Sequence, residues 1–123
     1  TFSMKYNLLF DKLFGFGLFE KEIRERETDY YIKESNGYGV PLDTRKDYTK
    51  SDWILWCAAL TDEREKAESL YAPVIRFLKE TPTRLPFGDW YDTKSGKYIH
   101  FYNRTVQGGI LAPLLKKSGK LKI

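Results

Sequence analysis

Apolar side chains recur every three or four positions along much of the chain, which is the spacing of one face of an α-helix. This period predicts helices over residues 2–14, 18–35, 62–80 and 106–115. Residues 53–60 are apolar on nearly every side and predict one more helix, which is buried. Thr49 and Asp52 precede it in the spacing of a variant capping box, so we expect this helix to begin next to them. Pro73 predicts a kink or a break in the helix over 62–80.

Two regions lack the helical period. Residues 36–48 combine glycine, proline and polar side chains, which predicts an ordered loop. Residues 83–104 are rich in aromatic side chains and are punctuated by glycine. Within them, 87–91 and 97–101 are separated by a glycine-containing segment, and this arrangement predicts a short β-hairpin. The sequence as a whole therefore predicts an all-α fold with one small β element.

The order of the predicted helices indicates how the chain is organised. Four of them, joined by short and medium connections, form two antiparallel hairpins, and the fifth has no partner within the chain. Because each helical hairpin buries its apolar face against neighbouring hairpins, this arrangement is typical of a piece of a larger array. We therefore expect residues 1–123 to form a single partial domain with an apolar flank that is exposed or covered by a second copy.

Composition and charge narrow the function classes. The chain has 123 residues, 41% of them hydrophobic, which is enough for one core and too little for two. The net charge of +4 comes from the tail, because four of the 21 basic residues are lysines within the last eight positions. The body is therefore neutral and lacks the basic, aromatic-rich face that indicates a nucleic-acid partner. The longest apolar stretch, residues 53–60, is too short to cross a bilayer, so we expect no membrane span.

Cysteine and histidine content argues against a metal centre. Cys57 is the only cysteine and His100 the only histidine, so the chain has no internal disulfide and no plausible set of zinc ligands. We expect neither a metal nor a cofactor. Cys57 lies within an apolar run and is predicted to be a small buried side chain. His100 is interpreted as a hydrogen-bonding or surface residue rather than a general base.

Five short motifs carry a resemblance to a known family. They are Asn-Gly-Tyr-Gly-Val-Pro-Leu-Asp-Thr-Arg at 36–45, Tyr-Thr-Lys-Ser-Asp-Trp at 48–53, Glu-Thr-Pro at 80–82, Asp-Trp-Tyr-Asp-Thr at 89–93 and Val-Gln-Gly-Gly at 106–109. Together they resemble the C-terminal domain of the secreted glutaminase A family, known from filamentous fungi and from bacteria such as the Bacteroides relatives. The resemblance spans nearly the whole chain, from about Tyr6 to Leu115.

This resemblance implies an α/α toroid of the six-hairpin glycosidase type. The chain would supply about the last five helices, in the C-terminal part of a larger protein whose remaining hairpins are its partners. The resemblance also implies that the intact protein hydrolyses L-glutamine, a small-molecule substrate, and that the isolated fragment is inactive or nearly so. It further implies an extracellular or periplasmic location.

The glutamine hypothesis selects candidate residues in two of these motifs. Arg45 has the bidentate fork that binds the α-carboxylate of an amino acid, and Asp43 is suited to its α-ammonium group. Tyr38 and Asp52 accompany them along the chain and are included as substrate-binding candidates. The alternative is structural: Asp43, Arg45 and Asp52 brace the loop and cap the following helix.

Asp89 and Asp92 are the remaining acidic candidates. With Trp90 beside them, they are similar to the paired carboxylates of glycoside hydrolases built on toroids. The alternative is that both are ordinary turn residues. The catalytic candidates are thus Asp43, Asp89 and Asp92, and the substrate-binding candidates are Tyr38, Arg45, Asp52 and Trp90. If these residues form a pocket, we expect Tyr38, Asp43 and Arg45 to converge near residues 89–92.

Three functions of different classes remain open at this point. The first is hydrolysis of the amide of glutamine by the intact protein. The second is a carbohydrate-active or carbohydrate-binding toroid, which the carboxylates and aromatic side chains also suit. The third is a helical structural domain that supports a catalytic site elsewhere.

Overall fold

The computed structural model describes residues 1–101 and 103–119, which form five α-helices, a 3₁₀-helix and two short strands. The helices are α1 (Leu8–Phe14), α2 (Lys21–Glu34), α3 (Ser51–Ala58), α4 (Arg64–Glu80) and α5 (Ala112–Ser118), and the 3₁₀-helix η1 (Thr105–Leu111) leads directly into α5. The strands are β1 (Tyr48–Lys50) and β2 (Trp90–Asp92). The predicted all-α class is confirmed. None of the described helices is long and apolar enough to span a membrane.

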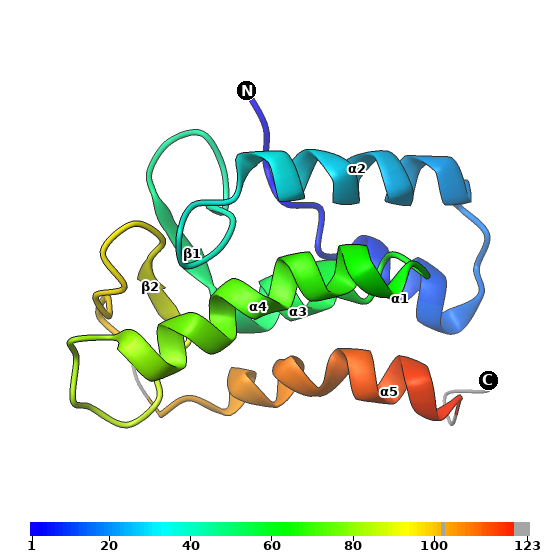
Figure 1. Ribbon diagram of the computed structural model, residues 1–123. Helices are drawn as coiled ribbons and strands as arrows, with labels where there is room; N and C mark the ends of the chain where they lie inside the picture. The colour runs from blue at the N-terminus through cyan, green and yellow to red at the C-terminus, as the bar shows by residue number, and fades with distance from the viewer. Residues whose placement is uncertain (102, 120–123) are drawn as a thin grey trace.

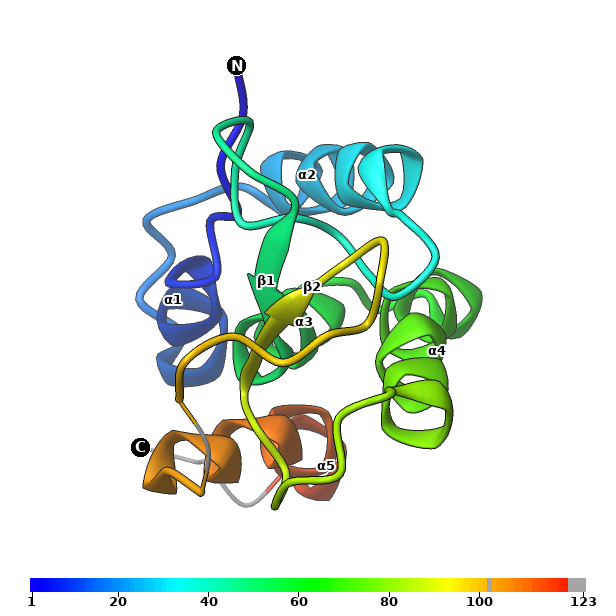
Figure 2. The same ribbon diagram turned by 90° about the vertical axis from the view of Figure 1, so that its left-hand side faces the viewer.

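Helix α3 lies at the centre of the molecule. Figure 2 shows α1, α2, α4 and α5 arranged around it, and Figure 1 shows α2 and α5 on opposite sides of the layer that holds α3 and α4. Ile54 and Cys57 of α3 are fully buried and belong to the same core as Tyr31 of α2 and Leu70 of α4. Because α3 has neighbours on all sides, its sequence is apolar on nearly every side. The predicted buried helix is confirmed.

Helix α1 is shorter than its apolar period predicts, because the first residues pair with the loop over 36–48. The Met4 amide donates to the Leu42 carbonyl at 2.8 Å, and Ser3 forms an antiparallel bridge with Asp43. The helix therefore begins at Leu8, and it ends before Gly15, whose φ of 67° favours glycine.

Helix α4 is continuous, with Pro73 in its interior. Its inward stripe of Leu70, Val74 and Phe77 is buried. This tertiary packing compensates for the backbone hydrogen bond that proline cannot make. Of the two outcomes that the sequence predicts at Pro73, a kink or a break, the break does not occur.

The two strands form an antiparallel pair in which Tyr48 lies opposite Asp92 and Lys50 opposite Trp90. The hairpin predicted within 87–101 is therefore present only in part. The chain does turn back after β2, through an isolated bridge between Tyr91 and Tyr98, but the partner of β2 in the ladder is β1. The pairing is fixed by burial, since the Tyr91 ring stacks on Phe77 at 3.7 Å and is inaccessible to solvent.

The capping box predicted at Thr49 is wrong. Thr49 is a fully buried residue of β1, and α3 begins at Ser51 with Lys50 in the N-cap position and no side-chain cap. The Ser51 amide instead donates to the backbone carbonyl of Asp89 at 2.8 Å. The backbone amide at the start of α3 therefore has a hydrogen-bond partner that is distant in sequence, where the sequence predicts a partner in a local cap.

The last helical segment has a partner, contrary to the prediction that it is alone. Segment η1 and helix α5 pack along α3, and the approach is close at Gly109, where a Cβ atom would lie 2.7 Å from Trp56 Nε1 and 3.0 Å from Asp52 Cβ. Glycine is thus required for this contact. Apolar side chains remain exposed on α4 and on the η1–α5 segment, among them Ile75, Leu78, Leu111 and Leu114.

Candidate functional site

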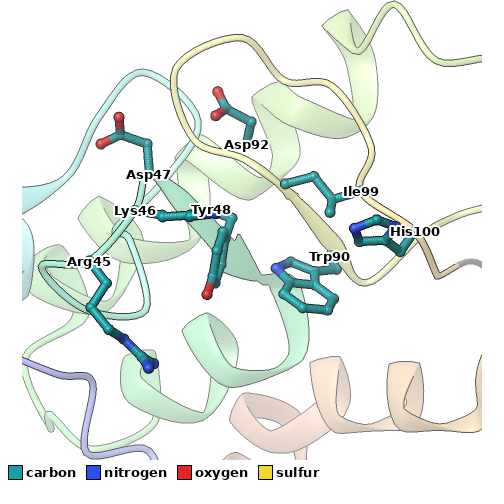
Figure 3. Close-up of a pocket in the computed structure, with 8 residues that line it drawn as sticks. All are labelled: Arg45, Lys46, Asp47, Tyr48, Trp90, Asp92, Ile99 and His100. Atoms are coloured by element: carbon teal, nitrogen blue, oxygen red, sulfur yellow. The ribbon is translucent and has the colours of Figure 1, made fainter.

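A cavity of about 670 Å³ lies beside the strand pair, at the end of the molecule that carries the loops. Three stretches of the chain line it: the end of the loop before β1 together with the first residue of β1, the strand β2, and the segment that turns back after β2. The lining residues are Arg45, Lys46, Asp47, Tyr48, Trp90, Asp92, Ile99 and His100. Figure 3 shows Arg45 and His100 at opposite ends of the group, with the rings of Tyr48 and Trp90 between them.

The strand register explains why these residues meet. Side chains alternate between the two faces of a strand, and paired residues share a face. Tyr48 and Lys50 of β1 therefore lie on the same face as Asp92 and Trp90 of β2. Tyr91 points to the opposite face, into the core. A three-residue ladder thus separates the cavity from the hydrophobic core.

Arg45 is held at the rim of the cavity by Asp43. Arg45 Nε donates to both carboxylate oxygens of Asp43 at 3.0 Å, and Nη2 donates to Oδ2 at 2.6 Å. These hydrogen bonds hold the pKa of Asp43 below its ordinary value. The Arg45 side chain is nevertheless 78% exposed. The guanidinium group is therefore fixed in direction and open to solvent, whereas the Asp43 carboxylate is already engaged.

Asp92 lies at the cavity as an ionised carboxylate. Its Oδ1 atom accepts hydrogen bonds from the amides of Lys94 and Ser95, at 3.0 and 2.7 Å, and from the Ser95 hydroxyl at 2.9 Å. Partial burial by itself raises the pKa of Asp92, but the hydrogen bonds from Ser95 and Lys94 outweigh it and the pKa is lowered. Asp47, across the ladder, pairs with Lys94 Nζ at 2.9 Å.

Trp90 and His100 form the aromatic wall of the cavity. The Trp90 ring meets Tyr48 edge to face, with centroids 5.1 Å apart, and stacks on Phe101 at 5.5 Å. The His100 ring lies 6.0 Å from Trp90. His100 has a φ of 54°, and the Phe101 amide donates across it to the Ile99 carbonyl at 2.7 Å, as in a γ-turn. A non-glycine residue with positive φ is uncommon and is found more often at functional sites.

A second cluster of charged residues lies deeper, against α3. Asp89 is fully buried and contacts two cations: Arg104 Nε donates to Oδ1 at 3.2 Å, and Lys50 Nζ lies 3.3 Å from Oδ2. Burial raises the pKa of Asp89, but the hydrogen bonds from Arg104 and Lys50 outweigh it, so the pKa is lowered. Lys50 Nζ also lies 3.9 Å from Asp52 and 4.1 Å from the centre of the Trp53 ring.

Asp52 is the less well satisfied member of this cluster. It is 2% exposed, and none of the described residues forms a hydrogen bond with its Oδ1 atom. Burial is the main cause that raises the pKa of Asp52; the charge of Asp89 adds to it, and Lys50 opposes it. Neither Asp52 nor Asp89 lines the cavity.

Tyr38 lies away from the cavity. Its hydroxyl donates to Glu80 at 3.0 Å, and its ring packs against Gly96. Its backbone, however, is tied to the strand region, because the Tyr38 amide donates to Thr93 and the Tyr38 carbonyl accepts from the Tyr91 hydroxyl. Tyr38 thus braces the loop instead of lining the cavity.

The seven candidates from the sequence therefore separate into groups. The structure brings Arg45, Trp90 and Asp92 together at the cavity and places Asp43 behind Arg45, while Asp52 and Asp89 lie in the buried cluster. Sequence reasoning did not select Lys46, Asp47 and Tyr48, although they directly follow the motif that contains Arg45. It considered His100 only as a surface or hydrogen-bonding residue, and it did not select Ile99 or Arg104.

The described residues contain no group of three or more His, Cys, Asp or Glu side chains that could hold a metal ion. Cys57 is completely buried in the core, and burial raises the pKa of its thiol. The residues that line the cavity supply arginine, lysine, carboxylate, aromatic and imidazole groups.

Fold and cavity define a domain of packed helices that carries a polar site at one end, next to a small strand pair. A family model described as the glutaminase A six helical-hairpin domain matches residues 1–114. The chain belongs to this family, as the sequence motifs indicate.

Two curated relatives are similar to the chain. Glutaminase A of Aspergillus oryzae is 37% identical over 118 residues, which cover 94% of this chain and 17% of the relative. A protein of Arthroderma benhamiae named "Probable glutaminase" is 33% identical over 99 residues, which cover 78% of this chain and 11% of the relative. The chain thus spans a small part of the length of these relatives. No solved structure matches it.

Proposed function

We propose that the full-length protein hydrolyses L-glutamine to glutamate and ammonia, and that this domain binds the α-carboxylate of the substrate through Arg45. Two relatives that carry glutaminase names support the reaction. The observation that carries the assignment is the Arg45 guanidinium, which is oriented by Asp43 and exposed at the rim of the cavity.

The hydrogen bonds of Arg45 leave part of its fork for a ligand. Its bonds to Asp43 use Nε and Nη2, and no described residue accepts a hydrogen bond from Nη1. A guanidinium group has five N–H donors, so it binds a second carboxylate without releasing the first. An α-carboxylate is a ligand of this kind.

Other groups at the cavity suit the remaining parts of glutamine. Asp47 and Asp92 provide negative charge for the α-ammonium group or for orienting a water molecule. In amide hydrolysis, that water adds to the carbonyl carbon, the C–N bond breaks, and the departing nitrogen takes up a proton. His100 contributes an imidazole group, which can donate or accept a hydrogen bond, to the same cavity.

We propose that residues from the rest of the protein complete the site. The chain covers 17% and 11% of the length of its two relatives. The cavity is lined by loop residues and by the short strand pair, and its lining residue Arg45 is 78% exposed. On this proposal the isolated domain releases little or no ammonia.

The test is Arg45→Ala in the full-length protein, with ammonia release from glutamine as the assay. We expect KM to rise about tenfold or more, since a charge-assisted bidentate contact is lost. The melting temperature should change little, because the pair with Asp43 is exposed. Arg64→Ala is the matched control: Arg64 is 89% exposed and pairs with Glu68 at 2.6 Å, but it lies on α4 away from the cavity.

An unchanged KM in Arg45→Ala would contradict the role given to Arg45. The assay should also include a panel of glycosides. The Tyr48–Trp90 aromatic pair at the cavity favours a sugar ligand as the second candidate. Glycoside hydrolysis without ammonia release from glutamine would select that candidate and reject the glutaminase proposal.

A further inference from the structure

Arg104 connects the two segments that form the aromatic wall of the cavity. It precedes η1 and reaches back to the residue just before β2, where it donates two hydrogen bonds to the carboxylate of Asp89. The same guanidinium group lies over the Phe101 ring, with its central carbon 4.4 Å from the ring centroid. One side chain thus contacts both segments.

Each contact of Arg104 lies next to a residue that lines the cavity. Asp89 directly precedes Trp90, and Phe101 directly follows His100. Phe101 also stacks on Trp90, with ring planes 14° apart. Displacement of Phe101 would therefore change the position of both Trp90 and His100.

The backbone on either side of Phe101 adopts a conformation that is uncommon for residues other than glycine. His100 has positive φ, and so does Asn103, with φ values of 54° and 55°. Residues in this conformation remain so when surrounding contacts hold them. Arg104 provides one of these contacts at Phe101, between the two positive-φ residues.

Arg104 does more than neutralise the charge of Asp89, because Lys50 neutralises the same carboxylate. Lys50 lies 3.3 Å from the same Asp89 carboxylate, so Asp89 keeps a cationic partner when Arg104 is replaced. The cation–π contact recorded for Lys50 is with Trp53. The link to Phe101 therefore depends on Arg104.

We infer that Arg104 is a positioning residue of the cavity: by holding Asp89 and Phe101 together, it fixes Trp90 against His100. The inference rests on the proposed function in one respect, namely that the cavity takes part in amide hydrolysis. Arg104 does not line the cavity and acts through its neighbours.

The kinetic test compares Arg104→Gln, Phe101→Leu and the double variant in the full-length protein. We expect each single change to lower kcat for glutamine about tenfold, with a smaller change in KM because Arg45 is untouched. The double variant should be no slower than the slower single variant, because both changes break the same link. Arg104→Lys should recover only part of the loss, since lysine keeps the charge but not the planar group over Phe101. Lys97→Gln, an exposed change in the same segment, should leave kcat unchanged.

A second measurement is independent of catalysis. Hydrogen exchange of the full-length protein, followed by mass spectrometry, reports how firmly residues 97–104 and 88–93 are held. Arg104→Gln should speed exchange in both segments, and Phe101→Leu should speed it in the first.

The outcomes separate the two proposals. If the wild-type protein releases no ammonia from glutamine, the glutaminase proposal is rejected. If Arg104→Gln nevertheless speeds hydrogen exchange in both segments, the positioning role remains supported. Losses of kcat that multiply in the double variant, or exchange that Arg104→Gln does not alter, would overturn the positioning role.

Discussion

Two arginine–aspartate pairs lie at the same end of the molecule and differ in their surroundings. Arg45 and Asp43 are two residues apart in one loop, and the arginine side chain is 78% exposed. Arg104 and Asp89 are fifteen residues apart, and the Asp89 side chain is fully buried. The first pair lies at the rim of the cavity and the second beneath its aromatic wall.

The comparison shows how one kind of contact serves two purposes. An exposed ion pair contributes little to stability, but it orients a cation that stays available to a ligand. A pair whose carboxylate is buried joins segments that are distant in sequence, and removal of that carboxylate takes a partner from both Arg104 and Lys50. On the proposals made above, the Arg45–Asp43 pair serves ligand recognition and the Arg104–Asp89 pair serves positioning.

Replacement of Asp89 should give the largest effect on stability. Asp89→Asn removes the carboxylate that pairs with Arg104 and the nearer of the two carboxylates around Lys50, and we expect a loss of about 3 kcal/mol in the free energy of unfolding. Asp43→Asn, the matched change in the rim pair, should leave the unfolding midpoint nearly unchanged. Urea denaturation of the purified chain measures both. If both variants lost the same free energy of unfolding, the difference in burial between the two pairs would not determine how much each contributes to stability.

Replacement of Gly109, where η1 packs on α3 beside Asp52, should have an intermediate effect on stability. A Cβ atom at Gly109 would meet Trp56 and Asp52 at 2.7 and 3.0 Å, so Gly109→Ala must displace η1 or the Trp56 ring. We expect a loss of about 1 to 3 kcal/mol. At Gly108 nothing lies within 4 Å of the corresponding atom, so Gly108→Ala is the control and should be near neutral. A tolerated Gly109→Ala, again by urea denaturation, would mean that η1 packs more loosely on α3 than the structure shows.

The parts of the fold that depend on neighbours in sequence could be predicted. The apolar stretch over 53–60 indicates a buried helix whatever the rest of the chain does, and α3 is buried. The Asp43–Arg45 pair could be selected as a candidate because both residues lie within one motif. The helices over 18–35 and 62–80 were predicted from the same local period.

The parts that depend on the path of the chain could not be predicted. Nothing local in residues 48–50 indicates a strand, because their partner lies some forty residues further on, in β2. For the same reason, Arg104 gave no signal of its contact with Asp89, and Gly109 gave none of its contact with Trp56. The cavity is built from segments that this pairing brings together, so only Arg45, Trp90 and Asp92 were selected beforehand.

Replacement of Asp52 should give the smallest effect on stability. Its sign should be opposite to that of replacing Asp89, because ionisation of Asp52 makes the folded chain less stable. Burial raises the pKa of Asp52, so the folded chain retains a proton that the unfolded chain has already lost. Between the ordinary pKa of aspartate and this raised value, the ionisation of Asp52 therefore makes the chain less stable as the pH rises. Asp89, whose pKa is lowered, loses its contribution as the pH falls.

Asp52→Asn tests this difference, because it removes the carboxylate whose pKa is raised. Below the ordinary pKa of aspartate, where Asp52 is protonated in both the folded and the unfolded chain, the variant and the wild type should have similar stability, and they should diverge as the pH rises. At pH 7 the variant should be the more stable protein, by no more than ~1 kcal/mol. The measurement is urea denaturation at a series of pH values. A variant that is less stable than the wild type at pH 7 would show that the contact with Lys50, 3.9 Å away, outweighs the burial of the Asp52 charge. In that case the two buried carboxylates would act alike, and the whole cluster, not Asp89 alone, would stabilise the base of the cavity.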